Sequence, residues 1–147
     1  MYQFVLILHL LGAAVWTGGH LVLVVTILPR ALRAKDPQVL VEFESAYEPL
    51  GLAALATQVI TGLWLAYYYL PDPAQWFALD STVSIYLSIK FVLLALTLGL
   101  ALDARLRLVP RLDATNLWAF AYHIIGVAIT AVLFIVAGVG LGTGGFF

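Results

Sequence analysis

Two histidines in the first hydrophobic stretch of the chain, His9 and His20, have the type and spacing that suit metal or cofactor chemistry. They are eleven positions apart. At about 100° per residue they fall on one face of a helix, with Trp16 between them on the same face. Imidazole and indole N–H groups would lack hydrogen-bond partners in lipid, so we expect this face to contact protein.

The other polar groups within apolar stretches are His123 and Lys90. Counting inward at about 1.5 Å per residue places His20 and His123 at one depth in the inner half of a bundle. The same count places His9 and Lys90 at one depth in the outer half. Thr57 or Gln58 could join the inner layer, and the outer layer adds the tyrosines at 67–69. A lysine within a membrane costs about 2.5–3.5 kcal/mol on insertion scales, which indicates a function for Lys90.

Two imidazoles at one depth on different helices suit the axial positions of a b-type haem, so we predict His20 and His123 as the axial pair. His9 is the competing ligand, or the ligand of a second haem. We predict Lys90 and His9 as the catalytic pair, with Lys90 as a proton donor, a partner of a carboxylate or an axial amine. The alternative is that each histidine is structural and hydrogen-bonds across helices.

Five further residues are predicted to contact the cofactor. The glycines would let a ring approach the backbone, and the arginines would hold propionates or only set the topology. The alternative for the tryptophan is that it serves only in helix packing and interface anchoring. These residues are Gly12, Trp16, Arg30, Arg107 and Gly126.

Composition fixes the class of protein. Of 147 residues, 63% are hydrophobic and 10% are charged, which is typical of an integral membrane protein. A hydrocarbon core of about 30 Å takes about 20 helical residues. Four stretches are long enough, at about 2–28, 50–70, 83–102 and 117–139, and they predict an all-α four-helix bundle with a single domain, 1–147. The first stretch is expected to be a retained helix and not a signal peptide. Residues 37–48 form either an interfacial helix or an inner extension of the second helix.

Basic residues set the expected topology. Six of the seven lie after the first and third stretches, whereas the second connection carries only Asp72 and Asp80. The positive-inside rule therefore predicts an N-out, C-out protein of a bacterial-type inner (plasma) membrane. The basic residues are Arg30, Arg33, Lys35, Arg105, Arg107 and Arg111. The charge pattern predicts no nucleic-acid partner, and a chain without cysteine has no disulfide or thiolate metal site.

The residues also resemble known families. The run His9-x-x-Gly12-x-x-x-Trp16-x-x-Gly19, followed by Tyr86-Leu-Ser-Ile-Lys90-Phe, resembles the HemJ-type protoporphyrinogen oxidases. The fuller form, with Trp16-Thr-Gly-Gly and Leu28-Pro-Arg30, is similar to the CopD-type copper-resistance membrane proteins. The resemblance implies a four-helix, haem-associated membrane protein with His9 and Lys90 as functional positions.

We therefore expect a haem b protein with an electron-transfer or oxidoreductase role and a quinone, a porphyrin or a small oxidant as partner. Whether it is an enzyme stays open. The alternative is copper handling of the CopD type, with His9, His20 and His123 as ligands. Soft sulfur ligands suit Cu(I) best, and this chain has a single methionine, which ranks copper below haem at this point. A third alternative is a partner subunit without cofactor. Small residues such as Gly51, Ala53, Ala54 and Ala56 suit a homo-oligomer interface or helix packing.

Overall fold

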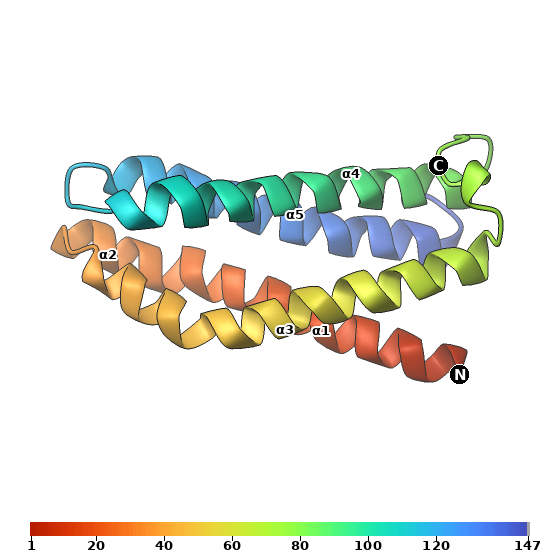
Figure 1. Cartoon of the computed structure of the whole chain (residues 1–147), viewed down its shortest axis with the longest axis horizontal. Helices are drawn as coiled ribbons and strands as arrows, with labels where there is room; N and C mark the ends of the chain where they lie inside the picture. The colour runs from red at the N-terminus through yellow and green to blue at the C-terminus, as the bar shows by residue number, and fades with distance from the viewer. Residues whose placement is uncertain (147) are drawn as a thin grey trace.

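Four long helices dominate residues 1–146, which the computed structural model describes (Figure 1). The first is α1 (Tyr2–Val22), which continues through a π-helical turn (Leu23–Ile27) into α2 (Leu28–Ala34). The second is α3 (Gln38–Tyr69). The third is α4 (Thr82–Asp103), followed by a π-helical turn (Ala104–Leu108) and a 3-10 turn (Val109–Arg111). The fourth is α5 (Leu117–Thr143), and a 3-10 turn (Pro73–Gln75) lies between α3 and α4.

Each of the four helical segments is long and apolar enough to cross a membrane, so the predicted all-α class with four membrane helices is confirmed. The predicted helix ends were too short at the basic end. The first helix continues to Ala34, which puts Arg30 and Arg33 on a helix and not in a loop. The segment 31–34 consists of Ala, Leu and Arg, which are strong helix formers.

The predicted choice for residues 37–48 is resolved as an extension of the second membrane helix. α3 runs without interruption from Gln38 through Pro49 to Tyr69, so a separate interfacial helix is wrong. Pro49 removes one backbone hydrogen bond and does not end the helix. α3 bows away from α4 in the part that contains Pro49 (Figure 1).

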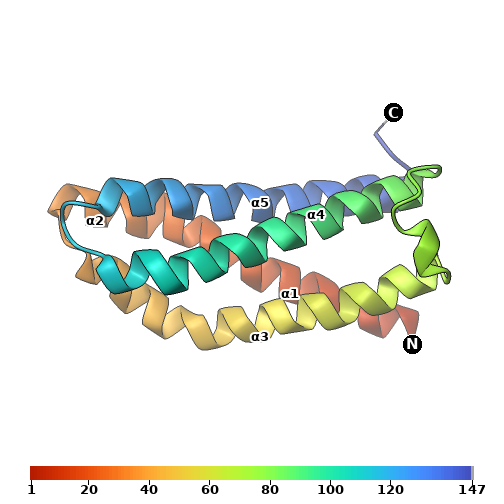
Figure 2. The same cartoon turned by 45° about the horizontal axis from the view of Figure 1, so that its top comes forward.

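The helices pack as two antiparallel pairs that meet through α1 and α5. α1 packs mainly on α3 and α4 mainly on α5, while α1 also contacts α5 (Figure 2). The two chain ends lie at the same end of the bundle, opposite α2 and the α4–α5 connection. α3 and α4 are not a main packing pair.

Prolines explain the two π-helical turns. Leu28, which precedes Pro29, donates its backbone N–H to the carbonyl of Leu23, five residues back. Val109, which precedes Pro110, makes the same bond to Ala104. A proline ring clashes with the carbonyl four residues earlier, so the turn before it widens. Both wide turns lie at the same end of the bundle.

An apolar cluster at this end ties α2, α3 and α5 together. Its buried residues are Leu23, Leu28, Ala31, Leu40, Leu117, Phe120, Ala121 and Ile124. The connection before α5 is held by Asp113, which accepts hydrogen bonds from the Thr115 hydroxyl at 2.6 Å and the Thr115 amide at 2.7 Å. These two bonds, of which the bond from the hydroxyl has the larger effect, hold the pKa of the Asp113 carboxyl below its ordinary value.

Candidate functional site

His20 and His123 line one cavity of about 430 Å³ in the half of the bundle that contains α2. α1 supplies Trp16 and His20, and α5 supplies His123. α3 supplies Glu44, Tyr47 and Glu48 to the wall of the cavity. The π-helical turn after α4 supplies Arg105. The two predicted inner-layer histidines are thus brought to one space, from helices more than a hundred residues apart in sequence.

The ring orientation of His20 is set by its own helix. His20 Nδ1 donates a hydrogen bond to the backbone carbonyl of Trp16 at 2.8 Å. The Trp16 ring lies against it, with 4.4 Å between ring centroids, and the edge of Tyr47 faces it at 6.1 Å. With Nδ1 bonded to a carbonyl, the neutral imidazole keeps its lone pair on Nε2.

His123 has the opposite tautomer. Its Nε2 donates to the backbone carbonyl of Leu100 on α4 at 2.7 Å, so the neutral ring keeps its lone pair on Nδ1. The nearest acidic atom to Nδ1 is Oδ2 of Asp103, at 3.8 Å. Only 10% of the His123 side chain is exposed, against 37% of the Asp103 side chain, so the imidazole is the more deeply buried of the two.

Tyr47 fills the space where α3 meets α1 beside His20. Its hydroxyl donates to the carbonyl of Val15 at 2.9 Å. A Cβ placed on Gly19 would overlap the Tyr47 ring, and one on Gly51 would lie 2.9 Å from Tyr47 Cε1. The two glycines therefore let the tyrosine ring sit between the helices.

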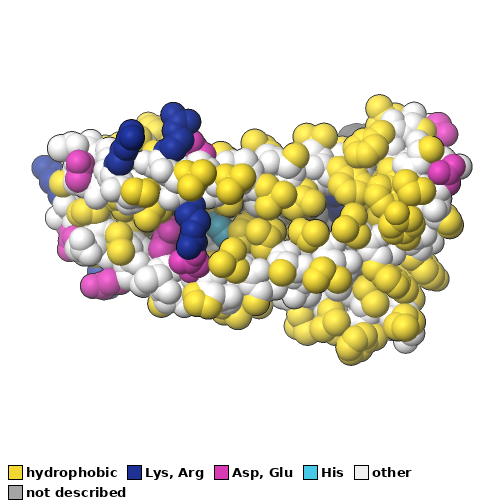
Figure 3. Space-filling view, viewed as in Figure 1, with side chains coloured by type: hydrophobic (Ala, Val, Ile, Leu, Met, Phe, Trp, Pro, Cys, Tyr) yellow, Lys and Arg dark blue, Asp and Glu magenta, His cyan; other side chains and the backbone are white. Residues whose placement is uncertain are grey.

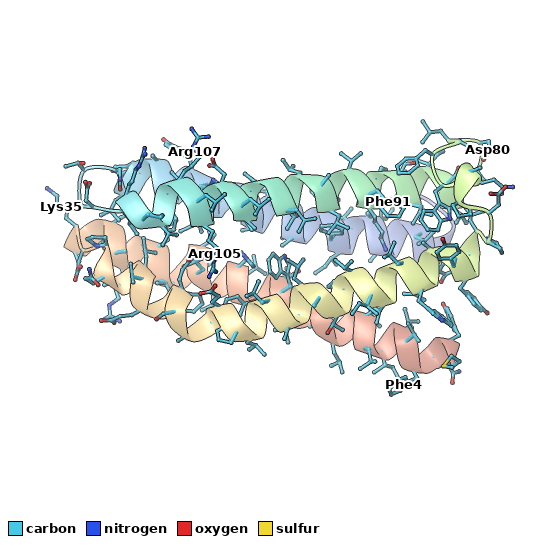
Figure 4. All side chains as sticks on the ribbon, viewed as in Figure 1. Phe4, Lys35, Asp80, Phe91, Arg105 and Arg107 are labelled. Carbon is cyan, nitrogen blue, oxygen red and sulfur yellow. The ribbon has the colours of Figure 1, made fainter. Side chains whose placement is uncertain are left out.

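Charged side chains form the mouth of the cavity, which we define as Glu44, Glu48 and Arg105. Arg105 makes an ion pair with Glu48, and its label in Figure 4 marks it in the space between α4 and α3. Arg107 instead points away from the bundle and pairs with Asp103 at 3.0 Å. Figure 3 shows basic and acidic side chains gathered at this end of the molecule, with a histidine visible in the hollow beside them.

The predicted outer pair lies in a separate place. His9 Nδ1 is 2.8 Å from the hydroxyl oxygen of Thr61, and that hydroxyl donates to the carbonyl of Thr57 at 2.5 Å. The Thr61 oxygen must therefore accept from His9, which leaves the lone pair of the neutral ring on Nε2. Lys90 approaches α5, where a Cβ on Gly138 would lie 3.8 Å from its Nζ. Within residues 1–146, Lys90 has no ion pair.

The other predicted contact residues are dispersed. Trp16 lines the cavity. Gly12 packs against α3, where its Cβ would meet the Gln58 side chain at 2.5 Å, and a Cβ on Gly126 would meet nothing within 4 Å. Arg30 and Arg107 are exposed and are absent from the cavity lining.

Sequence reasoning missed the charged mouth and the tyrosine. Glu44 and Glu48 are four residues apart and share one face of α3, a signal that was present in the sequence. Arg105 was indistinguishable from the other basic residues, because what sets it apart is its ion pair with Glu48 on another helix. Within residues 1–146, no group of three or more His, Cys, Asp or Glu side chains is arranged to hold a metal ion. The histidine pair therefore offers two nitrogen donors.

Comparison with known proteins gives one family match. The family model described as copper resistance protein D matches residues 41–142, which is more than half of the chain. The matched part includes α3 from residue 41 on, all of α4, and His123, whereas His9 and His20 precede it. No curated protein and no solved structure matches this chain.

Proposed function

Because this chain belongs to the CopD family of copper resistance proteins, we propose that it is a copper-handling membrane protein that binds a copper ion between His20 and His123. The observation that carries the proposal is that both imidazoles line one cavity. The family description supports copper as the ion, and the cavity supplies a place for it.

The donor atoms suit copper. Imidazole is a good copper ligand and binds through either ring nitrogen. His20 offers Nε2 and His123 offers Nδ1, because a backbone carbonyl occupies the other nitrogen of each ring. A carbonyl on the second ring nitrogen is the usual outer-shell partner of a metal-binding histidine, since it fixes the tautomer and raises the basicity of the ligand.

Two donors are few for permanent storage, but they suit an ion in transit. An ion that passes through a membrane protein must bind well enough to enter and weakly enough to leave. The carboxylates of Glu44 and Glu48 lie on the same cavity and attract a cation toward the histidines. This arrangement favours handling of copper as cargo.

The haem predicted from the sequence fits this geometry less well. A haem with two axial histidines normally takes the Nε2 atom of each ring, because Nδ1 is crowded by the ring's own Cβ. His20 meets this condition, but His123 uses its Nε2 for the carbonyl of Leu100. The cavity thus supports a small ion better than a porphyrin between these two rings.

His9 and Lys90 stay candidates for a second, outer station. The free Nε2 of His9 is a further nitrogen donor, and Lys90 is an amine without an ion pair within residues 1–146. Eleven residues at about 1.5 Å each put His9 about 16 Å from His20 along the helix, so the two cannot share one ion.

Copper titration of the purified protein tests the proposal. We expect Cu(I), measured by competition with a chromogenic chelator, to bind with one ion per chain at the cavity site. His20→Ala and His123→Ala should each weaken binding by more than about tenfold, since even the loss of an outer-shell partner costs about 10–100-fold. His9→Ala is the matched control for the affinity of the cavity site alone, because it removes an imidazole from the same helix as His20 that does not line the cavity.

Two results would contradict the proposal. One is unchanged copper affinity in both His20→Ala and His123→Ala. The other is a purified protein that binds no copper and carries one haem per chain, with a Soret band that both variants lose.

A further inference from the structure

We propose that the ion pair between Arg105 and Glu48 is a cation-exchange gate at the mouth of the cavity. An incoming cation takes the place of the Arg105 guanidinium on the Glu48 carboxylate and then passes to the histidines. The identity of the cation rests on the proposed copper function, whereas the gate itself rests on the position of the pair.

The order of exposure places the pair between solvent and the histidines. The Arg105 side chain is 66% exposed and the Glu48 side chain 40%, whereas that of His123 is 10% exposed. All three line the same cavity. A cation that approaches from this end therefore meets the ion pair before it meets an imidazole.

The charges of the mouth favour a cation over an anion. Glu44 and Glu48 lie one helical turn apart on α3 and face a single guanidinium, that of Arg105. The nearest further basic residue on this turn, Arg107, is occupied by Asp103. The mouth carries one negative charge in excess, and it carries two when Arg105 swings out. A cation therefore gains when it replaces the guanidinium.

The pair is also built to open. Arg105 comes from the π-helical turn Ala104–Leu108 and crosses the space between α4 and α3 to reach Glu48 (Figure 4). The contact joins two helices that are not a main packing pair. Partly exposed ion pairs are weak, and the long arginine side chain can leave without any movement of a helix.

Accessibility of an introduced cysteine tests the gate without any copper. The chain has no cysteine, so Val127→Cys in the cavity wall would be the single reactive thiol. The probe is a trimethylammonium methanethiosulfonate, a cationic thiol reagent, and the measurement is its rate of reaction. Arg105→Gln should raise this rate about three- to fivefold, the factor that release of a partly exposed ion pair supplies. Arg111→Gln, which removes one positive charge from the same end outside the cavity, is the matched control.

Glu48→Gln separates a cation-exchange gate from a simple plug. It also breaks the ion pair, but it leaves an unpaired guanidinium at the mouth, so the cationic reagent should react more slowly than in the parent. A plug would give the same rise in Glu48→Gln as in Arg105→Gln, and that result would overturn the proposal. Equal rates in Arg105→Gln and Arg111→Gln would also overturn it.

A second cysteine position guards against misfolding of the first. Ala101→Cys lines the same cavity from α4 and should show the same order of rates. If the reaction rates follow this order but the protein binds no copper, the gate proposal stands and the proposed copper function is wrong. If copper binds through the histidines but the reaction rates do not follow this order, only the gate proposal is wrong.

Discussion

Gly19 determines how closely Tyr47 can approach the backbone of α1 next to His20. The Tyr47 ring occupies the place where a Cβ of Gly19 would lie, and its hydroxyl reaches the carbonyl of Val15. Gly18, one position earlier, has nothing within 4 Å of its own Cβ position. Adjacent glycines of one helix thus have different roles, which makes them a matched pair.

We expect Gly19→Ala to lower the stability of the protein and Gly18→Ala to leave it unchanged or raise it. Overpacking of this kind costs about 1–3 kcal/mol, whereas alanine in a helix gains about 0.5–1 kcal/mol over glycine. Thermal unfolding in detergent measures both. The steric role assigned to Gly19 is wrong if the two variants have the same midpoint. Copper affinity should fall only in Gly19→Ala, because the displaced tyrosine borders His20.

The sequence predicts one depth for His20 and His123, and both line one cavity, but it did not predict how their rings are hydrogen-bonded. Counting from the ends of apolar stretches placed His20 and His123 together because helical rise is constant. The same count could not show that Leu100 takes the Nε2 of His123. It also could not select Arg105 from six basic residues at one end, since that choice depends on contacts between helices.

Pro49 lies where α3 bends beside the cavity. Its ring removes the N–H that would bond to the carbonyl of Ser45, and helices bend at such positions. Glu48 and Gly51, which flank it, line the cavity. The bend in α3 therefore lies beside the proposed copper site.

Pro49→Ala should make the protein more stable and bind copper less well. Restoring the hydrogen bond gains up to about 3 kcal/mol in a helix interior, and a straighter α3 closes on the cavity. The measurements are the midpoint of thermal unfolding and the Cu(I) affinity. Pro71→Ala, outside the helices, is the control and should not raise the midpoint. A Pro49→Ala protein with unchanged stability and affinity would show that the bend has another cause.

Helix ends were the least predictable feature of the elements. Hydropathy detects the part of a helix that lies in lipid, and helices here continue past it to Ala34 and begin before it at Gln38. The charged residues of these extensions, such as Glu44 and Glu48, look like loop or surface residues in the sequence. They form part of the candidate site because the helices extend beyond the apolar stretch.

Six of the seven basic residues lie at one end of the molecule, and both chain ends lie at the other. The fold class and the CopD resemblance predicted from the sequence are confirmed, by four helices that are apolar enough to cross a membrane and by the family match over residues 41–142. The resemblance to HemJ-type oxidases stays a prediction. So does the orientation in the membrane, since the length and composition of the helices show which segments could cross a membrane and not in which direction they cross it.

We propose that the basic end faces the cytoplasm of a bacterial-type inner membrane, so that the gate opens inward and both chain ends lie outside. Arginine and lysine near short connections are retained on the cytoplasmic side. Alkaline phosphatase fused after residue 147 should therefore be active, and a fluorescent protein that folds only in the cytoplasm should stay dark there. The same two reporters inserted at residues 112–116, between α4 and α5, should give the reverse result. A bright fluorescent fusion after residue 147 would show the opposite orientation, in which copper reaches His20 and His123 from the outside.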